Sequence, residues 1–270
     1  MTDPAPLLVE RDGKILIATL NRPDKLNALN AAIMALFERT LHEFRDDPGL
    51  VVMLVKAKGR YFSAGADLRD GLPPSPGAGG SELREMHRRG LNGMHRIYDE
   101  MEAIEKPIVV AHQAKCVGGG LELSLSCDFR LAARSASYAF PEGLFGMIPA
   151  SNGVSRLTRL IGTHWARYLI MANRELPADR ALMAGLVHEV FPDESFEKEV
   201  MEFCQHLAKQ NPAQMAAAKL AIELARDVGV AQARNVERMA NAALMLEPSY
   251  REGLAKYMQG IGTKSGEKAV

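Results

Sequence analysis

Three consecutive glycines at residues 118–120 interrupt an apolar stretch, CVGGGLELSLSCDF, that covers residues 116–129. They follow an apolar run at 108–115 that predicts a strand, and they open a segment from Gly119 to about Ser126 that predicts a helix. The first amides of such a helix carry the positive end of the helix dipole and can hold an anion or a developing oxyanion. A tight turn with close packing is the simpler interpretation, and the glycines alone do not decide between the two.

Two nucleotide-binding patterns are excluded at this turn. The dinucleotide fingerprint requires G-x-G-x-x-G, which GGGLEL at 118–123 does not match. A P-loop ends in Gly-Lys-Ser/Thr, a sequence that does not occur in the chain. What remains is a strand, a glycine turn and a helix whose first amides point into solvent or towards a ligand.

The pattern of apolar residues along the chain predicts an α/β core followed by helices. Two short strands flank Asp12-Gly13, and Asn30 is placed to cap a helix that runs to about Phe44. Further strands are expected at 51–59, 108–115, 129–134, 136–140 and 186–190, with a helix at 82–104. After residue 150 helices predominate, at 153–161, 164–172, 178–184, 195–209, 212–228, 230–246 and 248–259. We therefore expect an α/β core over residues 1–200 and a helical C-terminal region over residues 201–270.

Composition indicates a globular protein, because 47% of the residues are hydrophobic and 24% are charged. Lys and Arg together number 33, as do Asp and Glu, and a net charge of zero argues against a nucleic-acid partner. No apolar window has the length of a membrane span, so no membrane association is expected. Cys116, Cys127 and Cys204 are odd in number and widely spaced, which is typical of buried reduced thiols. With an N-terminus unlike a signal or transit peptide, these features predict a cytoplasmic protein.

Two glutamates lie in apolar surroundings. Glu122 follows the glycine run, and Glu142 follows Pro141 at the end of the apolar segment 136–140. The simpler interpretation of each is a first-turn acid that stabilises a helix. Two carboxylates that emerge from apolar surroundings are also a common means of dividing acid and base roles.

An ordered set of motifs resembles the enoyl-CoA hydratase/isomerase (crotonase) family over about residues 10–255. The motifs are NRPDKLNAL at 21–29, FSAGADL at 62–68, GGGLEL at 118–123, Cys127-Asp128, FPE at 140–142, GMIP at 146–149, LTRLIG at 157–162 and AGLV at 184–187. The resemblance implies a crotonase-like (ClpP/crotonase) fold, an α/β spiral of repeated β-β-α units with a helical C-terminal region. It also implies a homotrimer or a dimer of trimers, assembled through the region 201–270.

The resemblance further implies an enoyl-CoA hydratase, a hydro-lyase that reversibly adds water across the 2,3 double bond of an enoyl-CoA thioester. It assigns the thioester oxygen to the backbone amides of Ala66 and Gly119, which form an oxyanion hole. It gives Glu122 the role of the base that orients water and Glu142 the role of the acid. The positions that it implies for substrate and CoA binding are Lys25, Ala64, Asp67, Leu68, Arg69, Gly118 and Ala150. No metal is expected, and no cofactor beyond the CoA of the substrate itself.

Other functions remain open at this point. A double-bond isomerase or a specialised hydroxyacyl-CoA dehydratase of the same family is the nearest alternative. A catalytically silent acyl-CoA-binding or RNA-associated relative belongs to a different class, which the zero net charge and the paired glutamates disfavour. Fold similarity alone does not settle the matter, because one fold hosts many reactions.

Two segments depart from the common family pattern. Ala150-Ser151-Asn152 replaces a glycine-rich turn, and we expect the Ser151 and Asn152 side chains to cap the helix that follows. The alternative is that they add polar groups near the pocket and admit an oxygenated or branched acyl group. The proline-rich segment 71–81 predicts an irregular loop. The charged residues that follow it, including His95, are expected to form a solvated helix face. The alternative is that these residues close over the substrate.

Overall fold

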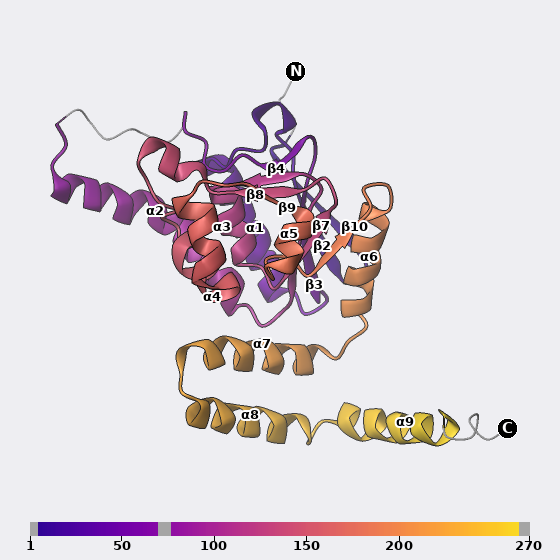
Figure 1. Ribbon diagram of the computed structural model, residues 1–270. Coiled ribbons are helices and arrows are strands. Elements are labelled where there is room, and N and C mark those ends of the chain that lie inside the picture. Colours follow the sequence, from indigo (N-terminus) through magenta and orange to yellow (C-terminus); the bar gives the residue numbers. More distant parts are fainter. Residues whose placement is uncertain (1–4, 70–76, 265–270) are drawn as a thin grey trace. The chain divides into compact units, whose positions relative to one another are not determined.

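The computed structural model describes residues 5–69 and 77–264, which divide between two compact units, Met1–Lys209 and Gln210–Val270 (Figure 1). The predicted boundary at residue 200 falls inside helix α6 (Phe196–Leu207), which belongs to the first unit. Part of the predicted loop at 71–81, residues 71–76, lies outside the described residues. Among the residues that the structure describes, no helix is long and apolar enough to cross a membrane.

A six-stranded sheet forms the first layer of the Met1–Lys209 unit. Its strand order is β1-β2-β3-β5-β7-β10. The first two strands form the antiparallel hairpin predicted around Asp12-Gly13, and every other pair in the sheet is parallel. The strands are β1 (Leu7–Asp12), β2 (Ile15–Leu20), β3 (Val52–Ala57), β5 (Ile108–His112), β7 (Phe129–Ala133) and β10 (Glu189–Phe191). The strands β2, β3 and β5 are almost wholly buried, as near-continuous apolar runs in a parallel sheet require.

A second, four-stranded sheet has the order β4-β6-β8-β9. Its strands are β4 (Tyr61–Ser63), β6 (Lys115–Val117), β8 (Ser137–Ala139) and β9 (Leu176–Pro177). The first three are parallel, and β9 is antiparallel to β8. The prediction of one strand over 108–115 was wrong, because the chain leaves the first sheet after His112 and enters the second at Lys115.

The chain passes from the first sheet to the second three times. β3 leads to β4 and then to α2 (Gly80–Ala103), β5 to β6 and α3 (Gly119–Leu125), and β7 to β8 and α4 (Gly153–Ala166). These are the repeated β-β-α units expected of the fold. Because β4, β6 and β8 are parallel neighbours, the segments that follow Ser63, Val117 and Ala139 leave the sheet at the same edge.

The remaining helices of this unit surround the strands. The Asn30 side chain accepts a hydrogen bond from the Ile33 amide at 3.0 Å, which confirms the predicted cap of α1 (Ala31–Asp46). The three cysteines are buried and free, as predicted. The short helical elements are η1 (Pro23–Lys25), η2 (Pro141–Phe145), the π-helical turn η3 (Arg167–Met171) and α5 (Ala178–Met183).

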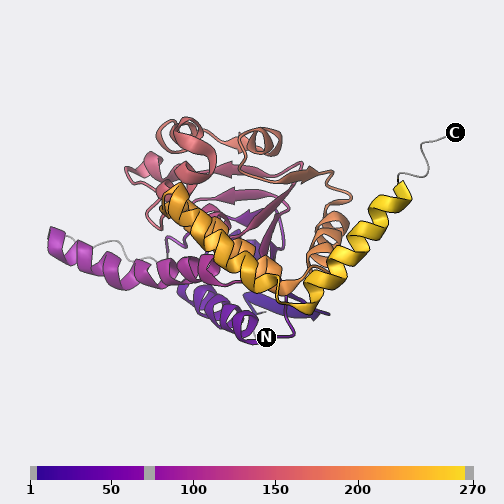
Figure 2. The same ribbon diagram turned by 90° about the horizontal axis from the view of Figure 1, so that it is seen from below.

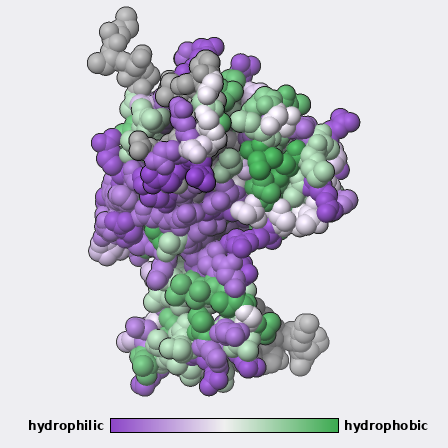
Figure 3. Space-filling model, turned by 90° about the vertical axis from the view of Figure 1, so that its left-hand side faces the viewer, coloured by the Kyte–Doolittle hydropathy of each residue, from purple (hydrophilic) through white to green (hydrophobic). Residues whose placement is uncertain are grey.

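The second unit contains three helices within its described residues, α7 (Pro212–Asp227), α8 (Val230–Leu244) and α9 (Pro248–Lys264), of which α9 is yellow in Figure 2. The Asn211 side chain caps α7 and donates a hydrogen bond to the Ser249 hydroxyl at 2.8 Å. Figure 3 shows hydrophobic side chains on the surface of these helices. Val230, Met239 and Leu246 are among the large apolar residues that the single chain leaves exposed.

The packing of α3 against β4 gives a stability prediction at Gly120. A Cβ at this position would lie 2.5 Å from the Cβ of Ser63, and Ser63 is fixed by a hydrogen bond from its hydroxyl to the Asn27 carbonyl. We expect Gly120→Ala to lower the free energy of unfolding by about 1–3 kcal/mol, measured by urea denaturation, although alanine favours helix. Gly253→Ala in α9, where a Cβ meets no atom within 4 Å, is the matched control and should be neutral or stabilising. Equal stability of Gly120→Ala and the wild type would contradict this packing.

Candidate active site

Two backbone turns meet at the edge where β4 and β6 end. Gly65 and Gly118 both have positive φ angles, +93° and +51°, which favour glycine. A Cβ on Gly65 would lie 3.0 Å from the Gly119 nitrogen, and a Cβ on Gly119 would lie 3.1 Å from the Ala66 nitrogen. The two segments therefore lie backbone against backbone, with the amides of Ala66 and Gly119 close to each other.

These two amides differ from their neighbours in hydrogen bonding. The amides of Ala64, Asp67 and Gly118 donate to carbonyl oxygens at 2.9–3.0 Å. Among the described residues, neither the Ala66 nor the Gly119 amide has an acceptor. Gly119 is the first residue of α3, where helix amides have no partner inside the helix. Two adjacent unpaired amides can bind one oxygen that carries negative charge.

An ion pair holds the segment that contains Ala66. The Arg22 Nη1 atom lies 3.1 Å from Asp67 Oδ2 and donates to the Ala28 carbonyl at 2.8 Å. Burial raises the pKa of Asp67, but the bonds from Arg22 and from the Arg69 amide outweigh it, so the pKa is lowered. Asp67, expected to line the substrate channel, therefore ties two segments of the chain together. The side chains of Lys25, Leu68 and Arg69 are exposed, and Ala64 is half-buried.

Glu122 lies inside the first turn of α3 and is only 5% exposed. Its Oε1 atom accepts a hydrogen bond from the Ser151 amide at 2.8 Å. Burial raises the pKa of Glu122, while bonds from the amides of Ser151 and Gly153 and from the Ser151 hydroxyl work in the opposite direction. A Cβ on Gly153 would lie 2.7 Å from Oε1, so only glycine brings that amide this close.

Glu142 lies in the first turn of η2, which begins with Pro141 after β8. Its Oε1 atom lies close to Gly118, since a Cβ on Gly118 would be 2.8 Å from this oxygen. Its Oε2 atom is buried and has no hydrogen-bond partner among the described residues. The pKa of Glu142 is raised to about 7, first by burial and then by the negative charge of Glu122. The site thus combines one carboxylate stabilised by amides with a second that takes up a proton near neutral pH.

The turn at 150–153 differs from its prediction. Asn152 stands at the N-cap of α4 with φ of 62°, but its side chain makes no cap hydrogen bond. Ser151 is buried and bonds to Glu122, so the predicted side-chain cap was wrong. Ala150 is exposed, and its carbonyl oxygen lies 3.0 Å from His95 Nε2 on α2, so His95 is not purely part of a solvated face.

Asn173 is a residue near the site that sequence reasoning missed. Its side chain lies against Gly143, where a Cβ would come within 2.6 Å of Asn173 Oδ1. It therefore packs behind the turn that carries Glu142. Its φ is 48°, a conformation that asparagine tolerates better than most residues. The asparagine itself is therefore the one signal that the sequence offers at this position.

Comparison with known proteins identifies the family. The family model described as enoyl-CoA hydratase/isomerase matches residues 10–261, nearly the whole chain. The chain belongs to this family. This enoyl-CoA hydratase/isomerase family member superimposes on the enoyl-CoA hydratase from Bacillus anthracis with a TM-score of 0.85. The two chains are 28% identical, and the match covers 94% of this chain and 96% of the other. The predicted crotonase-like fold is therefore confirmed.

Curated relatives of this enoyl-CoA hydratase/isomerase family member carry hydratase and dehydratase names. The chain is 28% identical to the 2,3-dehydroadipyl-CoA hydratase of Escherichia coli (strain K12), over 94% of this chain and 95% of the relative. It is 32% identical to the short-chain-enoyl-CoA hydratase of Clostridium acetobutylicum, over 80% of each. It is 34% identical to the carnitinyl-CoA dehydratase of Salmonella typhi, over 79% of this chain and 78% of the relative.

The described residues of this protein contain no cluster of potential metal ligands. Within residues 5–69 and 77–264, no three or more His, Cys, Asp or Glu side chains form a group that could hold a metal ion.

The raised pKa of Glu142 predicts a pH-dependent stability difference. The pKa of Glu142 rises from an ordinary 4.5 to about 7, so the folded protein favours the protonated carboxyl group. The contribution of Glu142 to the free energy of unfolding is therefore complete below pH 4.5 and is lost as pH rises through 7. Glu142→Gln cannot ionise, so it should be more stable than the wild type at pH 8 by about 1–2 kcal/mol, a value reduced for partial solvation, and equally stable at pH 4. Thermal unfolding at both pH values, with the exposed Glu194→Gln as control, measures this difference. A stability difference that is the same at pH 4 and pH 8 would contradict it.

Proposed function

We propose that this protein catalyses the reversible hydration of the 2,3 double bond of an enoyl-CoA thioester. One observation carries the proposal: the adjacent amides of Ala66 and Gly119 have no acceptor among the described residues, and the Glu142 carboxyl, which feels the charge of Glu122, lies against the neighbouring Gly118. Membership of the enoyl-CoA hydratase/isomerase family and relatives named as hydratases support it.

The two amides supply the electrophilic part of the reaction. When the thioester oxygen accepts hydrogen bonds from Ala66 and Gly119, the carbonyl is polarised and the β-carbon of the double bond becomes electrophilic. Attack at that carbon converts the thioester to an enolate, whose negative oxygen the same amides and the first turn of α3 stabilise. Loss of one such donor typically costs about 3–4 kcal/mol of transition-state stabilisation.

The two carboxyl groups handle the protons. Glu122, stabilised as a carboxylate by the amides of Ser151 and Gly153, accepts a proton from water while the water oxygen bonds to the β-carbon. The enolate then takes a proton at the α-carbon from Glu142, whose raised pKa keeps a substantial protonated fraction near pH 7. The two groups interact, so the pair titrates as a unit and the roles exchange in the dehydration direction.

The finer features of substrate binding and assembly are part of the same proposal. We infer that the CoA moiety lies along Ala64–Arg69, with Lys25 near its phosphates. Gly118 lies beside the acyl group, and the amide of Ala150 faces the water. The exposed apolar side chains of α7–α9 support assembly into a trimer or a dimer of trimers through residues 201–270. The reaction requires no cofactor beyond the CoA of the substrate. A cytoplasmic location stays a prediction.

The test is the paired substitution of the two carboxylates. We expect Glu122→Gln and Glu142→Gln each to lower kcat for a short trans-2-enoyl-CoA by about 10²–10⁴-fold, because each loses one proton-transfer step. Binding of the thioester, measured by calorimetry, should survive in both variants. Glu194→Gln is the matched control and should keep wild-type turnover.

Water labelled with ¹⁸O distinguishes the reaction class in the same assay. A hydratase places the label at the β-carbon of the hydroxyacyl product, whereas a double-bond isomerase moves the double bond and takes up no label. Wild-type turnover in either glutamine variant would sink the paired-carboxylate mechanism, and product free of label would replace the hydratase proposal with an isomerase.

A further inference from the structure

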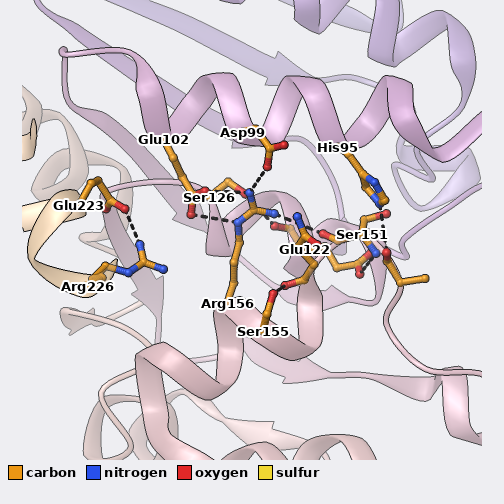
Figure 4. A network of polar contacts seen from close by, with 12 residues as sticks. His95, Asp99, Glu102, Glu122, Ser126, Ser151, Ser155, Arg156, Glu223 and Arg226 are labelled. Carbon is orange, nitrogen blue, oxygen red and sulfur yellow. Dashed lines mark hydrogen bonds and ion pairs between the residues drawn. The ribbon is translucent and has the colours of Figure 1, made fainter. Parts of the chain in front are cut away.

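Arg156 is a buried cation that takes no direct part in the proposed reaction. It lies on α4, its side chain is 6% exposed, and Figure 4 shows it between α2 and the turn that contains Ser151. Its Nε and Nη2 atoms donate to the two carboxylate oxygens of Glu102 at 2.9 and 2.8 Å, and Nη2 also donates to Asp99 at 2.7 Å. Asp99 and Glu102 lie three residues apart, on one face of α2. The planar guanidinium is therefore fixed in position and orientation.

The peptide groups around Ser151 connect this cation to Glu122. The Ser151 carbonyl accepts a bond from Arg156 Nη1 at 3.4 Å, and the Ser151 amide donates to Glu122 Oε1 at 2.8 Å. Ser151 is thus held on one side by Arg156 and itself holds Glu122 on the other, as Figure 4 shows. A second tie to α2 is the contact between the Ala150 carbonyl and His95.

Geometry outweighs charge in the effect of Arg156 on Glu122. The guanidinium is paired with two carboxylates, so its positive charge is already balanced. Among the causes that lower the pKa of Glu122, the amide bonds from Ser151 and Gly153 precede the charge of Arg156. The groups with a charge or proton that interact with Glu122 are Arg156 on α4, Tyr98 on α2 and Glu142 on η2. His95 on α2 contacts the Ala150 carbonyl next to Ser151.

We propose that Arg156, anchored by Asp99 and Glu102, is a positioning residue that holds the Ser151 amide against the carboxylate of Glu122. This inference rests on the proposed hydratase function for its kinetic consequences, but the position of Glu122 can be tested without turnover. Arg156 does not touch the reacting atoms; it acts through Ser151.

Arg156→Lys tests the proposal because it keeps the charge and removes the planar fork. We expect kcat to fall on the order of 10²-fold, as small displacements of a catalytic group cause, while KM changes by less than about 2-fold. The acid limb of the pH profile of kcat/KM should move to higher pH, because Glu122 loses a hydrogen bond that favours its ionised form. Glu102→Gln, a milder change, should act in the same direction, and Glu105→Gln, exposed just beyond α2, is the control and should change neither value.

A double-mutant cycle separates positioning from a general effect on folding. In the Glu122→Gln background, Arg156→Lys should produce no further loss of kcat, because the residue through which it acts is already lost. A loss that multiplies across the two substitutions would overturn the proposal. If Arg156→Lys does not fold, the same cycle is carried out with Glu102→Gln.

A ¹³C NMR titration of the Glu122 carboxyl, assigned by its disappearance in Glu122→Gln, gives a readout independent of activity. The proposal predicts a higher pKa of Glu122 in Arg156→Lys than in the wild type, and an unchanged pKa would overturn it. A wild-type protein that hydrates no enoyl-CoA would disprove the proposed function alone, because the titration would still report whether Arg156 positions Glu122.

Discussion

The close approach of the Gly65-Ala66 turn to the Gly118-Gly119 turn is the contact around which the rest of the site is arranged. Side chains at Gly65 or Gly119 would separate the two backbones, since a Cβ at either position would lie 3.0–3.1 Å from the amide opposite. The contact exists because β4, β6 and β8 run parallel as neighbours and release their next segments at one edge. The third of these segments carries Glu142, so three passes of the spiral deliver both amides and one carboxylate to one place.

The two carboxyl groups obtain different properties from different surroundings. Both are raised in pKa by burial, but Glu122 accepts bonds from backbone amides, whereas Glu142 has one oxygen without a partner among the described residues and also faces the charge of Glu122. A carboxyl group whose anion accepts bonds from backbone amides, beside one that holds its proton near neutrality, is the arrangement that acid–base catalysis on a polarised double bond requires. The family assignment and the local physical chemistry thus agree on the reaction class.

Much of the fold and part of the site could be predicted from the sequence, because local signals carried them. Asp12-Gly13 predicted a hairpin, Asn30 predicted a cap, and the glycine run with its two apolar-flanked glutamates pointed to the site. The second sheet was missed as a sheet, because β4, β6 and β8 are three residues each and too short to show a period. The role of Ser151 was predicted wrongly, and those of Arg156 and Asn173 were not predicted. Their contacts join segments that lie far apart in the sequence, and in a sequence a buried polar residue cannot be told from a solvent-exposed one.

The central claim is that Ala66 and Gly119 together bind the thioester oxygen between the two carboxyl groups. A crystal structure with a bound, unreactive acyl-CoA tests it most directly, through the distances from the thioester oxygen to the two amide nitrogens. We expect both distances to be about 2.7–3.1 Å, with the α- and β-carbons facing Glu122 and Glu142. A thioester oxygen bound by other groups, or beyond hydrogen-bond distance of either amide, would contradict it.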